Sequence, residues 1–130
     1  MHFATLIASL PALALSVRAA AIGARQNESE TTVAEFVVYG ARCDGFGISF
    51  PVSVPLSEAN QCNPMPLEQS YGSIMLLSLH ESNPKCSLTV FFEEGCAPGS
   101  GFEFVSHSSD ICVNAPDRAG GWRSYMVECA

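Results

Sequence analysis

The chain has 130 residues, six cysteines and a formal net charge of −7 at pH 7. Loss of an N-terminal segment that contains Arg18 and Arg25 would leave four cationic and thirteen acidic residues, a net charge of about −9 (4 − 13). A surface this acidic repels phosphate backbones and anionic lipids, so we expect neither nucleic-acid binding nor electrostatic attachment to membranes.

Residues 1–20 are predicted to be a signal peptide. His2 precedes an apolar stretch from Phe3 to Val17, and the small residues at 19–21 offer a cleavage site. The apolar run is too short for a membrane span, which needs roughly 18 apolar residues, and no later segment approaches that length. We therefore expect a secreted, extracellular protein without a membrane anchor.

Residues 21–32 are expected to be a flexible arm or a short propeptide that precedes a single β-domain over residues 33–130. The dipeptide Arg25-Gln26 fits a second trimming site and fits an ordinary arm equally well. Asn27 begins the one N-x-S/T sequon of the chain, which makes it a candidate glycosylation site.

The first half of the expected domain contains three strand patterns. Residues 35–39 are β-branched and aromatic, and Phe46, Ile48 and Phe50 alternate with small residues as in a half-buried strand. Residues 51–70 carry four prolines and are predicted to form a long loop with at most one short strand. Residues 73–79 are nearly continuous in apolar residues, which is typical of a strand buried on both faces.

The second half repeats this order after a linker turn at Asn83-Pro84. Residues 87–92 form a predicted strand, and the alternating residues 101–105 place Phe102 and Phe104 on one face. A polar loop follows over residues 106–116, and residues 122–128 form the last predicted strand. No stretch shows a 3.6-residue apolar period, so helix content should be low.

The apolar positions of these strands predict the core. We expect it to be built from Phe36, Val38, Ile48, Phe50, Ile74, Leu76, Leu88, Val90, Phe102, Phe104, Tyr125 and Val127.

Matched residues show that one unit occurs twice, over about residues 35–79 and 87–129. In each half an aromatic residue precedes a cysteine by four positions, a cysteine precedes a proline by four, and the last strand opens on aromatic-x-Ser-x-Met. The matched pairs lie roughly 50 residues apart and include Tyr39 with Phe92, Cys43 with Cys96, Cys62 with Cys112, Tyr71 with Trp122, and Ser73 with Ser124.

Six cysteines in a short secreted chain favour disulfides. Zinc binding is the competing use, but the chain has no CxxC pair. The simplest symmetric scheme joins each matched couple within its own half, and it predicts the pairs Cys43–Cys62, Cys96–Cys112 and Cys86–Cys129.

The repeated unit resembles the Greek-key unit of the βγ-crystallins. The resemblance rests on a strand ending in Tyr39 or Phe92, a glycine-containing turn, and the later serines Ser73 and Ser124. It implies a compact, disulfide-stabilised all-β sandwich of two Greek-key-like halves, with each serine packing on the hairpin of its half. Gly72 precedes Ser73, and an arginine precedes Ser124, so the serine pair of calcium-binding members is missing. We expect no metal and no cofactor.

The same arrangement looks like small secreted cysteine-rich proteins of filamentous fungi. Those proteins have a short signal, an Arg-Gln junction and a turn that follows a strand ending in Tyr. This second resemblance implies an extracellular, effector-like or toxin-like protein and no single target.

No catalytic arrangement stands out, so we do not expect an enzyme. His80 with Glu81, and His107 with Asp110, are the histidine–acid neighbours after the arm, and neither has the context of a hydrolytic triad. The adjacent pair Glu93-Glu94 is interpreted as a solvated hairpin tip rather than a glycosidase dyad.

Binding residues are sought on the loops, because variable connections on a rigid scaffold often carry function. Residues 52–70 and 106–121 occupy equivalent places and are expected to lie near one another. Arg118 and Arg123 stand out there on an acidic chain and are the candidate partner-binding residues, although solubilising charge is the simpler explanation. Trp122 and its counterpart Tyr71 are interpreted as core anchors rather than as carbohydrate-stacking residues.

We therefore expect a monomeric, secreted, non-enzymatic effector or virulence-associated protein that binds an unknown host or competitor component. The alternatives are an antimicrobial or killer-type toxin and a secreted hydrolase without a recognisable motif. The strong negative charge counts against a membrane-active toxin, since such toxins are usually cationic.

Overall fold

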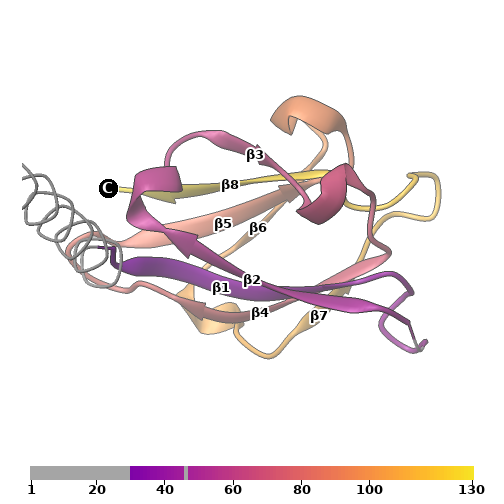
Figure 1. Ribbon diagram of the computed structural model, residues 1–130, viewed down its shortest axis with the longest axis horizontal. Helices are drawn as coiled ribbons and strands as arrows, with labels where there is room; N and C mark the ends of the chain where they lie inside the picture. The colour runs from indigo at the N-terminus through magenta and orange to yellow at the C-terminus, as the bar shows by residue number, and fades with distance from the viewer. Residues whose placement is uncertain (1–29, 46) are drawn as a thin grey trace, which may run out of the picture. The chain divides into compact units, whose positions relative to one another are not determined.

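The computed structural model describes residues 30–45 and 47–130, and these form an all-β fold (Figure 1). The predicted signal peptide, the Arg25-Gln26 site, Asn27 and Phe46 lie outside the described residues. The strands are β1 Thr32–Tyr39, β2 Ser49–Pro55, β3 Cys62–Pro64, β4 Ser73–Leu79, β5 Cys86–Phe91, β6 Gly101–Phe104, β7 Cys112–Asn114 and β8 Ser124–Cys129. Helical structure in the described part is limited to four short 3₁₀ turns: η1 Leu56–Glu58, η2 Pro66–Glu68, η3 Glu94–Cys96 and η4 Ser106–Ser108.

The strands form two four-stranded antiparallel sheets that exchange one strand between the halves. One sheet has the order β2-β1-β4-β7, and the other has the order β3-β8-β5-β6. Each half therefore keeps its first, second and fourth strands together and gives its third strand to the other half. This arrangement confirms the predicted β-sandwich of two Greek-key-like halves.

The core lies between the sheets and contains most of the predicted residues. Phe36 from β1 meets Tyr125 from β8 edge to face, with ring centroids 5.1 Å apart. Burial of such aromatic and branched side chains is the main driving force for folding. The predicted core residues that are buried are Phe36, Val38, Ile74, Leu76, Leu88, Val90, Phe104, Tyr125 and Val127, and Phe50 packs against them partly buried.

Two core predictions are wrong. Ile48 is 70% exposed, because it precedes β2 in the turn that follows β1, beyond the end of the sheet. Phe102 is 44% exposed although its partner Val90 on β5 is buried. The reason is that β6 is an edge strand, so Phe102 has a neighbouring strand on one side only. Its ring lies 5.1 Å from that of Phe104.

The structure also corrects two strand predictions. β2 begins at Ser49 and continues through Pro51 to Pro55, in the stretch predicted as a loop. Proline is tolerated there because β2 is an edge strand, with a neighbour on one side only. β7 was missed in the predicted loop 106–116, since three residues show no periodicity and the strand is defined by its pairing with β4.

The disulfides correct the pairing predicted within each half. Cys86–Cys129 is confirmed, but the other bridges join Cys43 to Cys112 and Cys62 to Cys96. The strand exchange is the reason. Cys112 begins β7, which belongs to the first half's sheet, and Cys62 begins β3, which belongs to the second half's sheet. All three pairings of these four cysteines satisfy the repeat, and the exchange selects the one that joins each hairpin to the strand received from the other half.

Candidate functional site

The β1–β2 hairpin, at the right in Figure 1, and the β5–β6 hairpin, at the top, lie at the end of the sandwich where β4 and β8 begin, and a buried serine holds each of them. Ser73, at the start of β4, donates a hydrogen bond to the Ala41 carbonyl over 2.7 Å. Ser124, at the start of β8, donates to the Glu93 carbonyl over 2.7 Å and accepts the Cys96 N–H over 3.0 Å. These bonds confirm that each serine packs on the hairpin of its own half. We call this region, residues 40–45, 47–48, 66–72, 92–100 and 115–124, the hairpin end.

The matched aromatics join the halves at the hairpin end. Tyr71 and Trp122 pair through two backbone hydrogen bonds of 3.0 and 2.7 Å. Trp122 is 2% exposed and donates its indole N–H to the Val113 carbonyl, while the Tyr71 hydroxyl donates to the Pro66 carbonyl. The core-anchor interpretation is confirmed, because neither ring has a face free for a sugar. Burial also raises the pKa of Tyr71 above its ordinary value.

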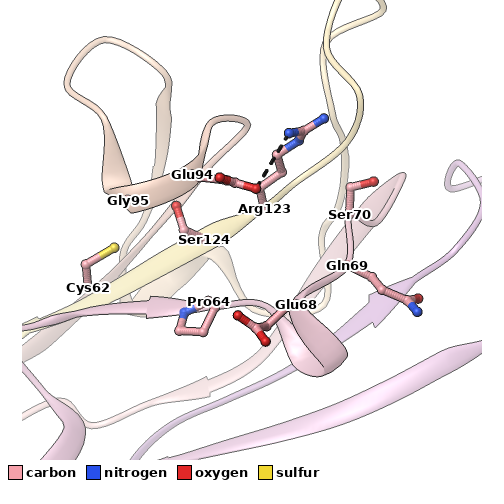
Figure 2. Close-up of a pocket in the computed structure, with 9 residues that line it drawn as sticks. All are labelled: Cys62, Pro64, Glu68, Gln69, Ser70, Glu94, Gly95, Arg123 and Ser124. Atoms are coloured by element: carbon pink, nitrogen blue, oxygen red, sulfur yellow. Dashed lines mark ion pairs between the residues drawn. The ribbon is translucent and has the colours of Figure 1, made fainter.

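A first depression of about 580 Å³ opens between the two halves at the hairpin end (Figure 2). Glu94 and Arg123 approach each other on one wall, and Glu68 comes from the opposite wall after β3. The remaining lining residues are Cys62, Pro64, Gln69, Ser70, Gly95 and Ser124.

A second depression of about 810 Å³ adjoins the first and shares Glu94 and Arg123 with it. Arg118 and Asp117 line it from the loop before β8, and Glu93 lines it from the β5–β6 hairpin. The remaining lining residues are Phe92, Pro116, Ala119 and Gly120, which add apolar surface and backbone.

Among the described residues, three of the four cations lie at the hairpin end: Arg118 and Arg123 line the second depression, and Arg42 lies beside it. Of the four Lys and Arg residues in the described part, only Lys85 lies elsewhere, in a depression at the opposite end. Arg42 forms an ion pair with Asp117 over 2.9 Å. Arg123 has a looser approach to Glu94, 3.9 Å between Nη1 and Oε1. Within the described residues Arg118 has no ion-pair partner.

The structure brings together the two arginines that the sequence singled out. Arg118 and Arg123 line the same second depression. The loop ends also meet as expected, because Ser70, residues 115–117 and residues 119–121 line a common surface. Gly121 has φ of +112°, and a Cβ there would stand 3.1 Å from the Cβ of Ser70. Sequence reasoning missed Arg42 and Asp117, whose pairing across 75 positions leaves no local signal.

The histidines and the paired glutamates are not assembled with one another. His80 Nδ1 lies 2.7 Å from the Pro84 carbonyl, and His107 is exposed in η4. Glu93 and Glu94 are exposed on the hairpin, as predicted for a solvated tip. Among residues 30–45 and 47–130, no group of three His, Cys, Asp or Glu side chains is arranged to hold a metal ion. No helix in the same part of the chain is long and apolar enough to cross a membrane.

Comparison with protein-family models, curated proteins and solved structures finds no match to this chain. The chain is a small cysteine-rich β protein, and its three disulfides indicate an oxidising, extracellular-type environment.

Proposed function

We propose that this protein is a secreted, non-enzymatic binding protein whose partner, a component of a host or a competitor, docks at the hairpin end. One observation carries the proposal. Arg118 and Arg123 line the second depression, and Arg42 lies beside it through its ion pair with Asp117, at one end of a strongly acidic protein. Arginine is enriched at the centres of protein interfaces, where its planar head forms several hydrogen bonds at once.

The construction of this end supports a binding role. The hairpins are held by the buried Ser73 and Ser124, and two disulfides tie β3 and β7 to them. A surface fixed in this way loses little conformational entropy when a partner binds. The depressions are therefore largely formed before the partner arrives.

The identity that we propose is that of an effector-like fungal protein with a double Greek-key repeat of the βγ-crystallin type. The exchanged third strands and the two hairpin serines support the Greek-key part of this proposal. The signal-like N-terminus and the six bridged cysteines support secretion.

The proposal is tested by incubating the mature, oxidised protein with extracellular fluid from a candidate host and from competing microbes, and cross-linking it to the components that it binds. We expect saturable capture of one partner, and loss of capture when the protein has been reduced and alkylated, because the hairpin end is then no longer tied together. Absence of saturable capture from every fluid would contradict the proposal. Growth arrest of a competitor would favour the toxin alternative, and turnover of a glycan or peptide substrate would favour the hydrolase.

A further inference from the structure

We infer that the second depression recognises a mixed-charge peptide segment of the partner. A carboxylate of the peptide would lie between Arg118 and Arg123, and a cationic group would lie against the acidic side chains of the same depression. This inference rests on the proposed binding function and specifies its ligand. It concerns a protein partner, not a polysaccharide or a nucleic acid.

Both signs of charge line this one depression. Arg118 and Arg123 supply two positive charges, and Glu93, Glu94 and Asp117 supply three negative ones. The volume of about 810 Å³ is enough for several side chains. A ligand that carried only one kind of charge would meet repulsion from part of this lining.

Arg123 is already positioned for a ligand. Its backbone N–H donates to the Phe91 carbonyl over 2.8 Å, and its carbonyl accepts the Met65 N–H over 3.1 Å, so the backbone is fixed on both sides. The guanidinium lies along Gly120, where an added Cβ would stand 2.8 Å from Nη2. A side chain at position 120 would therefore displace the guanidinium.

Arg118 and Arg123 are available to bind a carboxylate of the ligand, because no close ion pair holds either of them in the described part of the chain. The separation of 3.9 Å between Arg123 and Glu94 is longer than a charge-assisted hydrogen bond of about 2.8 Å, so a ligand carboxylate can bind with little loss of existing contact. Arg42 differs, because Asp117 holds it at 2.9 Å. Arg118 is exposed and has no ion-pair partner in the described part of the chain.

The surroundings favour a peptide over a charged polymer. The protein is acidic as a whole, so a polyanion such as a polyuronate is repelled before it reaches the arginines. A polycation would be attracted to the surface but would meet Arg118 and Arg123 inside the depression. Phe92, Pro116 and Ala119 offer apolar contact to the stems of long side chains.

The test is an NMR titration of the mature, ¹⁵N-labelled protein with four probes. Three are hexapeptides blocked at both ends, composed of alternating lysine and glutamate, of glutamate alone, and of lysine alone, and the fourth is an oligogalacturonate. We expect saturable shifts at the amides of Glu94, Gly120 and Arg123 with the alternating peptide, with at least about tenfold tighter binding than any single-sign probe.

Three variants, each lacking one positive charge, sharpen the test. R118Q and R123Q should each weaken binding of the alternating peptide by about tenfold. K85Q removes the same charge at the opposite end and should leave binding unchanged. The NMR spectrum of each variant reports whether it is folded, and R118Q alters an exposed side chain with no ion-pair partner among the described residues.

Three outcomes would overturn the inference: no saturable shift with the alternating peptide, equal or tighter binding of a single-sign probe, or equal loss in K85Q. Failure here is distinct from failure of the proposed function. If R118Q and R123Q capture the same extracellular partner as the unaltered protein does, the binding role stands and this recognition site is wrong.

Discussion

At the hairpin end, two buried serine hydroxyls provide partners for backbone groups of the hairpins. Ser73 makes one such hydrogen bond and Ser124 makes two. The serines occupy matched places in the repeat, yet they carry different numbers of bonds.

We expect Ser124→Ala to destabilise the protein more than Ser73→Ala. Losing the Ser124 hydroxyl leaves the Glu93 carbonyl and the Cys96 N–H without this partner, at about 1–3 kcal/mol for each group that stays unsatisfied. Urea unfolding of the oxidised variants measures the difference. Ser78→Ala is the control, since Ser78 is exposed and makes only a 3.4 Å contact to Glu35. Equal losses in all three variants would contradict the expectation.

We expect the raised pKa of Tyr125 to make the free energy of unfolding fall at alkaline pH. Burial, and then the negative charge of Glu58, raise the pKa of Tyr125 above its ordinary value. The folded state therefore favours the neutral phenol. This contribution to the free energy of unfolding is fully present below about pH 10, the pKa of an unfolded tyrosine. It is lost as the pH rises further, because the tyrosine of the unfolded chain ionises first. Burial raises the pKa of Tyr71 in the same direction.

Glu58→Gln should lower the pKa of Tyr125 and reduce the alkaline loss of stability. Spectrophotometric titration of tyrosinate measures the pKa, and urea unfolding at neutral and alkaline pH measures the loss. Tyr125→Phe serves as the reference in which this contribution is absent. An unchanged titration in Glu58→Gln would show that Glu58 does not act on this phenol.

Among the elements, β3 and β7 depend most on their tertiary neighbours. Each has three residues and lies at the edge of the sheet built by the other half. Disulfides fix them there, Cys62–Cys96 for β3 and Cys43–Cys112 for β7. The bridges therefore replace the long hydrogen-bonded ladders that such short strands lack.

Removal of either bridge by paired Cys→Ala substitution should cost about 4 kcal/mol in the chain-entropy model. The Cys43–Cys112 bridge should cost slightly more, because it closes 69 positions against 34 for Cys62–Cys96. Urea unfolding measures both. Peptide mapping without reduction should first recover these two pairs, and a fragment joining Cys43 to Cys62 would refute the pairing.

The backbone pairing of Tyr71 with Trp122 depends on the glycine at position 121. A Cβ at Gly121 would lie 2.8 Å from the Tyr71 carbonyl oxygen, and the φ of +112° is strained for any other residue. Gly121→Ala should therefore lower the melting temperature clearly more than Gly99→Ala, where φ is +86° but no atom lies within 4 Å. Equal shifts of the melting temperature in the two variants would contradict this prediction, because they would show that the close approach to Tyr71 adds nothing to the backbone strain.

For the whole molecule, strand exchange means that neither half contains a complete sheet. The sheet of the first half takes β7 from the second, and the sheet of the second takes β3 from the first. The Cys43–Cys112 and Cys62–Cys96 bridges both cross between the halves. The linker at residues 80–85 is therefore not the main connection between them.

Residues 31–82 expressed alone should remain unfolded, because the first half lacks β7 and both bridging partners. Circular dichroism and NMR dispersion measure this. The matched control is the oxidised full chain cut once within residues 81–83, which should stay folded because both crossing disulfides hold it together. Cooperative unfolding of the isolated half would contradict the prediction.

Much of the fold follows from local patterns. The long strands β1, β4, β5 and β8 have the β-branched and alternating residues that predict them, and most of the predicted core is buried. The core predictions failed for Ile48 and Phe102, because alternation does not show where a strand ends or whether its outer edge is covered. At the candidate site, the sequence indicated Arg118 and Arg123, but their placement in one depression with Glu94 and Asp117 depends on loops that no local rule positions.

The repeat in the sequence determined that the fold has two equivalent β-rich halves and that four cysteines belong to them. It did not determine which cysteines meet, because bridges within halves and bridges between halves satisfy the same symmetry. The tertiary structure decided this through the exchange of β3 and β7, whose short ladders gain their stability from the opposite half. The same exchange brings the loops of both halves to one end, where long-range packing and not local sequence places Arg42, Arg118 and Arg123 together.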